Sequence, residues 1–431
     1  MVKFFCFFFV HKKEDHLSLT LPRPPLAEMI EFNIRSTPID QPKKLNRSER
    51  ETNMTIKIQT GLVSAAVFAA TLGIATAQAA KTIDIGLIAD LTGPAALSGK
   101  HKVDGAKLAV NEINAKGGIN GKKIKLFVED DQGKNQAGVS AYEKLASNQN
   151  IIAIIGSVRS TIVNATLPYV ARDKIPTMIG GTDPMLTHVG NQWVFRFRPN
   201  DTYASRAMAG YAVDSMGAKK VAILYDTDAF GSAGNQLLKT AFAKDKTPVV
   251  SDQGYTTATR DYTSFLEKIK SSGANLLATY MTNSEDEAQM LKQLRQLGLK
   301  IEIMGSPSIA TAVCLQLAGS AVNGTYGVSD FVANGNPQAQ AFTAKYTAAY
   351  HSDPDLFGGW VYDAINVLSQ VIAKDGTSGP AIQKGIRAVK GYKGVEGVYN
   401  FDDKGDGLHG YSVVKITGGK VQLIKYDDFT K

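Results

Sequence analysis

Small polar residues with free backbone amides follow two of the buried strands that the sequence predicts. The strands are the apolar runs at 151–155 and 175–179, and the residues after them are Ser160, Thr161, Gly181 and Thr182. Ligands of open α/β sheets gather outside the carboxyl ends of strands, where hydroxyls and helix N-termini hold anions. Ser160 and Thr161 therefore predict a carboxylate-binding site, and Gly181 would let a ligand approach the backbone closely. A helix N-cap and a plain turn before Pro184 would also explain these residue types.

Charged residues lie beside these positions and at the end of a third strand. Arg159 precedes the hydroxyl pair, where its guanidinium could hold a second acidic group of a ligand or lie on the rim of a cleft. Asp226 and Asp228 follow a predicted strand at 221–225. A buried ammonium needs a carboxylate partner, which one of the two could supply. Capping the helix that follows is the other role open to them.

Motifs of nucleotide-binding and catalytic proteins do not occur in the sequence. It has no Walker A loop, no GxGxxG after the first strand and no GxSxG, and its six histidines form no catalytic set. The two cysteines, Cys6 and Cys314, make no zinc-site spacing with the histidines. The sequence therefore predicts a protein that is not an enzyme and that has no metal and no cofactor.

The composition is that of a globular protein with two domains. The chain has 431 residues, of which 44% are hydrophobic and 20% charged. The net charge of +8 comes from scattered Lys and Arg residues, with no run of five or more. Because a nucleic-acid interface gathers its positive charge on one face, no nucleic-acid partner is predicted.

Strands and helices alternate through most of the chain, which indicates a parallel sheet covered on both faces. The first set comprises strands at 81–90, 124–128, 151–155 and 175–179 and helices at 103–115, 136–148 and 160–172. A second set comprises helices at 202–216, 229–244, 262–271 and 285–297 and strands at 221–225, 249–255, 276–280 and 301–304. Helices at 338–351, 357–374 and 380–390 are expected to pack with the first set. The end is predicted to be β-rich, at 397–402, 409–416 and 420–426.

The first 79 residues have the pattern of a targeting segment and not of a folded domain. Residues 1–53 mix charges with prolines and show no sustained period, and we interpret them as an over-extended start that is not structured. Residues 54–79 have a positive start at Lys57, a short apolar run and the small-residue ending Ala77-Gln78-Ala79. This pattern is typical of a cleaved signal peptide, with Met54 as the true start and a mature protein from Ala80 in the periplasm.

A series of short motifs occurs in order along residues 81–431. They are Leu91-Thr92-Gly93-Pro94, the run from Gly105 to Ile119, Asp130-Asp131, Gly156-Ser157, the run from Gly181 to Thr187, the run from Tyr225 to Gly231 and the run from Met290 to Leu299. As an ordered set, they make the chain similar to the leucine/isoleucine/valine-binding protein family, the type I periplasmic binding proteins of ABC transporters.

This resemblance implies an α/β fold of two Rossmann-like lobes joined by three crossovers, with a ligand cleft between them. Lobe 1 would comprise 81–199 plus 332–396, and lobe 2 would comprise 200–331 plus 397–431. The hydroxyls and amides after the strands would hold the ligand carboxylate, and hinge closure would bury it.

The resemblance also implies the walls of the site. Phe230 stands where the family places an aromatic ring over the ligand, although packing in the core would also explain it. Ser98 stands in the place of a ring from the other lobe and would leave more room. Phe357 and Trp360 are further candidate walls, with core burial as their alternative role.

One position departs from the family pattern. Branched-chain binders use a glutamate soon after the strand at 301–304 to hold the α-ammonium, and Pro307 stands there in this chain. A carboxylate from a nearby loop could take over this role, and the candidates are Asp226, Asp228, Glu285 and Asp330. A ligand without an amine, such as an aromatic or aliphatic acid, would need none of them.

The resemblance therefore implies a monomeric substrate-binding protein that captures a small carboxylate-bearing solute and docks on a membrane permease. A branched-chain or other hydrophobic amino acid is the expected ligand, and an organic acid without an amine is the alternative. A periplasmic ligand sensor and a secreted enzyme are readings of other classes, which the neighbouring genes and an assay for turnover would separate.

Overall fold

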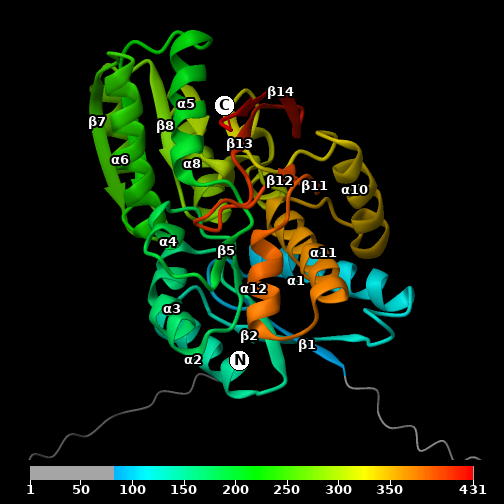
Figure 1. Cartoon of the computed structure of the whole chain (residues 1–431). Coiled ribbons are helices and arrows are strands. Elements are labelled where there is room, and N and C mark those ends of the chain that lie inside the picture. The colour runs from blue at the N-terminus through cyan, green and yellow to red at the C-terminus, as the bar shows by residue number, and fades with distance from the viewer. Residues whose placement is uncertain (1–81, 431) are drawn as a thin grey trace, which may run out of the picture. The chain divides into compact units, whose positions relative to one another are not determined.

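The computed structural model describes residues 82–430 (Figure 1). The predicted signal peptide, its cleavage site and the proposed start at Met54 lie outside the described residues.

The first sheet has five parallel strands in the order β2-β1-β3-β4-β5. They are β1 (Ile83–Ala89), β2 (Ile124–Asp130), β3 (Ile151–Ile155), β4 (Thr177–Ile179) and β5 (Val194–Arg196). Every residue of β1 is buried because helices cover both faces of the sheet. One face packs against α1 (Ala96–Ala115), α11 (Leu356–Asp375) and α12 (Gly379–Arg387), and the other packs against α2 (Asn135–Ser147) and α3 (Ser160–Asp173).

The second sheet has seven strands in the order β14-β13-β10-β9-β8-β6-β7. They are β6 (Val221–Asp226), β7 (Val249–Tyr255), β8 (Leu276–Tyr280), β9 (Glu302–Gly305), β10 (Tyr326–Ser329), β13 (Gly410–Thr417) and β14 (Lys420–Asp428). Strand β13 runs antiparallel to both of its neighbours, and the remaining pairs are parallel.

Helices also cover both faces of the second sheet. Helices α5 (Asp201–Asp214) and α6 (Ala229–Lys244) pack on one face. The other face packs against α7 (Thr263–Ser271), α8 (Ser284–Gln296) and α9 (Ala312–Ala318). Cys314 of α9 is fully buried in this second layer, and burial raises the pKa of its thiol well above the ordinary value.

Short elements complete the described part of the chain. They are α4 (Met185–His188), the 3-10 helices η1 (Pro307–Ala310) and η2 (Gly319–Val322), α10 (Pro337–Tyr350), and the hairpin of β11 (Tyr392–Lys393) and β12 (Val398–Tyr399). Helix α10 packs against α1 and α11 through its aromatic residues.

The chain passes between the two sheets three times: after β5, after β10, and between α12 and β13. A buried ion pair ties the first and third passages together. Arg196 Nε lies 2.9 Å from Asp406 Oδ1, and Thr187 and Asn200 also donate to this carboxylate. Burial would raise the pKa of Asp406, but Arg196 and these donors outweigh it and hold the pKa well below the usual range.

Two glycines allow a helix to start directly against the end of a strand. A Cβ on Gly99 of α1 would lie 1.8 Å from the carbonyl oxygen of Asp90, and a Cβ on Gly231 of α6 would lie 2.1 Å from that of Asp226. Only glycine permits approaches this close. The first turns of α1 and α6 are therefore fixed at the carboxyl ends of β1 and β6, one on each sheet.

Candidate ligand-binding site

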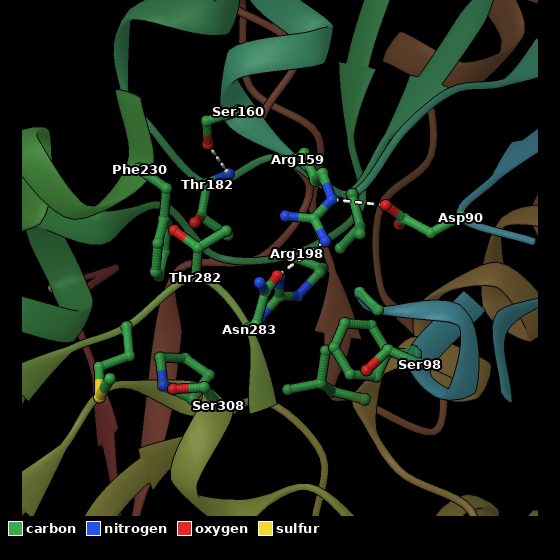
Figure 2. A pocket seen from close by; sticks show the side chains of 16 residues that line it. Asp90, Ser98, Arg159, Ser160, Thr182, Arg198, Phe230, Thr282, Asn283 and Ser308 are labelled. Carbon is green, nitrogen blue, oxygen red and sulfur yellow. Dashed lines mark hydrogen bonds and ion pairs between the residues drawn. The ribbon is translucent and has the colours of Figure 1, made fainter. Parts of the chain in front are cut away.

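A cavity of about 40 Å³ lies between the ends of the two sheets (Figure 2). Its polar lining comprises Asp90, Ser98, Arg159, Ser160, Thr182, Arg198, Thr282, Asn283 and Ser308. Its apolar lining comprises Ala95, Val158, Phe230, Met281, Pro307, Leu356 and Phe357. By comparison, a cavity of about 150 Å³ holds a molecule as large as benzene. The sheets or the lining must therefore move before a ligand of that size can enter.

Ser160 joins two of the loops that the sequence singled out. It is buried at the first position of α3, and its Oγ accepts hydrogen bonds from the amides of Thr182 and Asp183, both at 3.2 Å. These amides occupy its two acceptor sites, so its own O–H proton remains available as a donor. Arg159, not Ser160, occupies the N-cap position of α3. Ser160 therefore holds the turn after β4 and offers a proton to an acceptor such as a carboxylate.

Two threonine hydroxyls from opposite sheets face the same space as Ser160 (Figure 2). The buried Oγ1 atoms of Thr182 and Thr282 have no hydrogen bond of normal geometry. The Thr182 hydroxyl contributes to lowering the pKa of Asp201, whose burial otherwise raises it to about 7. A buried hydroxyl without a partner costs free energy, so both groups would gain from a ligand acceptor.

Arg159 is buried between the sheets. Its Nε donates to Asp90 Oδ1 at 2.5 Å and its Nη2 donates to Asn283 Oδ1 at 2.7 Å. Burial lowers the pKa of this guanidinium, but the carboxylate of Asp90 outweighs that effect and raises it. Arg159 is therefore buried and is not a surface arginine on the rim of a cleft, whereas its pairing with a second acidic group of a ligand stays a prediction.

Arg198 is a second buried arginine of the lining, and the sequence reasoning missed it. Its Nε and Nη2 donate to the two oxygens of Asp330, at 2.5 and 3.2 Å, and its Nη1 donates to the carbonyl of Gly180. A signal was present in the sequence, because Arg196 and Arg198 alternate with phenylalanines at the end of an apolar run. Charges at every second position of a buried strand need partners.

Ser98 and Phe230 both line the cavity and lie on opposite sides of it in Figure 2. The Ser98 hydroxyl donates to the carboxylate of Glu285, at 3.2 and 3.3 Å to its two oxygens. Phe230 packs against Tyr280 with 4.9 Å between ring centroids. The sequence reasoning named neither Asp90 nor Thr282 nor Asn283, although Asp90 directly follows a buried strand, as the predicted hydroxyls do.

Gly181 and Thr161 support the lining but are not part of it. The carbonyl of Gly181 accepts from Arg196 Nη1 at 3.3 Å. Thr161 Oγ1 accepts from the amide of Ala229 at 3.0 Å and donates to Asp228 Oδ2 at 3.4 Å. Thr161 therefore connects the first turns of α3 and α6 across the two sheets.

The structure does not bring Asp226 or Asp228 to the cavity lining. Both oxygens of Asp226 accept from the hydroxyl of Thr257 at 2.8 Å, and burial together with Asp228 raises the pKa of Asp226 to about 7. Asp228 caps α6, where its Oδ1 accepts from the amide of Gly231 at 2.9 Å. The helix-capping alternative therefore describes Asp228, and the ammonium role is left without support for either residue.

The remaining candidates are divided between the cavity and the core. Pro307 and Phe357 line the cavity, whereas Trp360 is fully buried in the core beside α1. Asp330 is paired with Arg198, and Glu285 is bonded to Ser98. In the part of the chain that the structure describes, no group of three or more His, Cys, Asp or Glu side chains could hold a metal ion, and no helix is long and apolar enough to span a membrane.

Comparison with known proteins identifies the family. A model of the periplasmic binding protein family matches residues 82–420. The chain belongs to the periplasmic binding protein family. Among the proteins that it is similar to are the Leu/Ile/Val-binding protein homolog 3 of Brucella melitensis, with 30% identity over 85% of this chain and 97% of that protein, and the Leu/Ile/Val-binding protein BraC3 of Rhizobium johnstonii, with 30% identity over 85% and 99%.

A solved structure supports the same assignment. The type 1 periplasmic binding protein of Bordetella pertussis matches with a TM-score of 0.72 and 28% identity, covering 80% of this chain and 99% of that one. The predicted family and the two-lobed type I fold of this periplasmic binding protein are thereby confirmed.

Proposed function

We propose that this periplasmic binding protein captures a small hydrophobic α-amino acid and delivers it to the membrane permease of an ABC transporter. The observation that carries the proposal is the cavity, where donors for a carboxylate meet apolar walls. Ser160, Thr182 and Thr282 supply hydroxyls, and Phe230 and Met281 supply apolar surface. The relatives named as Leu/Ile/Val-binding proteins support an amino acid as the ligand.

Lobe closure is part of the proposal. We take the lobes as 81–199 plus 332–396 and 200–331 plus 397–431. Hydrogen bonds between Ser98 and Glu285, and between Arg159 and Asn283, join groups that the two sheets carry at either side of the cavity. These contacts would break when the sheets separate to admit the ligand and re-form when they close over it. A monomer suffices for this cycle, and no cofactor takes part in it.

Export precedes binding in this scheme. The proposed signal peptide at 54–79 would be cleaved after Ala79, which places the mature protein in the periplasm. N-terminal sequencing of protein from the bacterial envelope should begin at Ala80 or Lys81.

Native mass spectrometry of protein purified from the envelope without refolding tests the proposal. We expect one bound molecule per chain with the mass of a leucine, isoleucine, valine or similar amino acid, and calorimetry with that compound should give 1:1 binding without turnover. If the amino acids do not bind, or if a bound compound is chemically converted, the proposed function is wrong. Binding of an amine-free organic acid in their place would select the alternative ligand class.

A further inference from the structure

Three charged side chains line the cavity, and two of them form one ion pair. Asp90 pairs with Arg159 inside the lining, whereas Arg198 is neutralised by Asp330, which holds it through both carboxylate oxygens. The two ion pairs therefore add no net charge to the cavity. Glu285, Asp286 and Glu287 lie one step further out, bonded to Ser98, Asn283 and Ser308 of the lining. A zwitterion keeps this balance on binding, whereas an anion without an amine adds one negative charge to a buried site.

Arg159 has a terminal nitrogen that makes no hydrogen bond within residues 82–430 and that faces the hydroxyls of Thr182 and Thr282. Its Nε is used by Asp90 and its Nη2 by Asn283, whereas Nη1 has no hydrogen bond within residues 82–430. In Figure 2 the guanidinium lies between Asp90 and the hydroxyls of Thr182 and Thr282, with a terminal nitrogen directed toward the threonines. A carboxylate placed among these hydroxyls would also receive a charge-assisted hydrogen bond from Arg159.

Asp90 is the one carboxylate among the residues that line this cavity. It is buried, and the Gly99 contact fixes the first turn of α1 against its carbonyl. Arg159 binds its Oδ1, and within residues 82–430 no second hydrogen bond is made to its Oδ2. Lys102 and Asp131, whose charges both act near Asp90, add one charge of each sign and leave the balance unchanged.

We infer that the Asp90–Arg159 ion pair recognises the two charged ends of an α-amino acid: Arg159 binds the carboxylate together with the hydroxyls, and Asp90 binds the ammonium. The inference rests on the proposed function and deepens it. A ligand ammonium that loses its water needs a carboxylate partner, and Asp90 meets this need where Asp226 and Asp228 do not. The ligand and the ion pair then lie with opposite charges facing each other.

Calorimetry with L-leucine and its des-amino analogue, 4-methylpentanoate, tests this assignment. The parent protein should bind leucine more tightly than the analogue by about 10- to 150-fold, the range for one charge-assisted hydrogen bond. Asp90→Asn should remove that preference or reverse it, because Arg159 then adds an uncompensated positive charge beside the ligand carboxylate. Asp228→Asn is the matched control and should keep the preference of the parent.

Asp90→Asn leaves the buried guanidinium of Arg159 without its carboxylate partner, which could prevent the variant from folding. A second variant covers this case. The double variant Asp90→Asn/Arg159→Gln removes both charges together, and it should bind leucine and 4-methylpentanoate with similar, weakened affinities. If either folded variant prefers leucine as strongly as the parent does, the assignment of the ammonium to Asp90 is overturned while the proposed function stands. If the parent itself prefers the analogue, the assignment fails and the amine-free ligand class is selected. If the parent binds neither compound nor any other α-amino acid, the proposed function fails.

Discussion

The hydroxyls of Ser160 and Thr182 line the same cavity but differ in the hydrogen bonds that they make in the unliganded protein. Ser160 accepts from two backbone amides, whereas Thr182 has no hydrogen bond of normal geometry. Removing Ser160 Oγ thus affects both folding and binding, whereas removing Thr182 Oγ1 affects binding.

Thr182→Val should weaken ligand binding by about 10- to 150-fold without lowering the melting temperature of the unliganded protein, because the buried hydroxyl that it removes has no hydrogen bond of normal geometry. Ser160→Ala should weaken binding on the same scale and also destabilise the protein by about 1–3 kcal/mol, because two buried amides lose their acceptor. Calorimetry and thermal unfolding of the two variants measure both effects. Full affinity in Thr182→Val would mean that the ligand carboxylate is held elsewhere.

At the scale of single residues, the sequence analysis selected two hydroxyl residues of the cavity lining, Ser160 and Thr182, but not Asp90 or Asn283. The simple rule that ligands bind after parallel strands selected Ser160 and Thr182, and it would have selected Asp90 had that residue not been assigned to the strand itself. The partners of Arg159 could not be predicted, because Asp90 and Asn283 are brought to it by two different sheets.

The first turn of α6 shows how one element uses residues that the sequence pointed to. Asp228 accepts from the amide of Gly231 there, and Gly231 lets the helix start against the end of β6. Asp228 is thus part of the helix and not of the cavity lining.

Asp228→Ala should lower the stability of the protein by about 1 kcal/mol through loss of the N-cap, whereas Asp228→Asn should keep most of it, because asparagine caps equally well. Ligand affinity should change little in Asp228→Asn, which keeps oxygen acceptors for Gly231 and Thr161. Urea unfolding and calorimetry of the pair check this expectation. A large loss of affinity in Asp228→Asn would contradict it and return Asp228 to the binding site.

Elements with strong periodicity were predicted well, and short elements were not. The ranges of α6, β7 and β8 agree with those expected from the sequence. Strands β5 and β10 and helix α9 were missed. The two strands have only three and four residues, and the seven residues of α9 make two helical turns, too few to show a helical period. Helix α1 begins at Ala96, seven residues before the predicted Val103, because Gly99 and polar residues hide its first two turns.

At the scale of the whole molecule, burial raises the pKa of several carboxyl groups. Burial is the largest cause in each case. It raises the pKa of Glu287, which bonds to Thr279 and Ser308, to about 7, and the pKa of Asp363 also to about 7. Such a group is protonated in the folded protein at a pH where the unfolded chain has already released the proton. Its contribution to stability is therefore full below about pH 4 and declines as the pH rises toward 7.

Glu287→Gln should make the free energy of unfolding less dependent on pH between 5 and 7.5. The parent should lose about 3 kcal/mol more than the variant over the whole range between the unfolded and folded pKa values, as follows from about 1.4 kcal/mol per pKa unit. Urea titrations at several pH values measure the slope. Glu267→Gln, at an exposed position of α7, is the control that should behave as the parent does. Equal slopes in parent and Glu287→Gln would show that Glu287 is ionised in the folded state.

The burial of Cys314 has a practical consequence. A thiol whose pKa is raised by complete burial is neither nucleophilic nor accessible to maleimides, and Cys314 is the one cysteine within residues 82–430. A cysteine introduced at the exposed Met185, which begins the short helix just after Thr182, would therefore be the reactive thiol of this part of the chain. A solvent-sensitive dye attached there would change its fluorescence as the cleft opens and closes. The protein could in this way serve as an optical sensor that reads the concentration of its solute in real time.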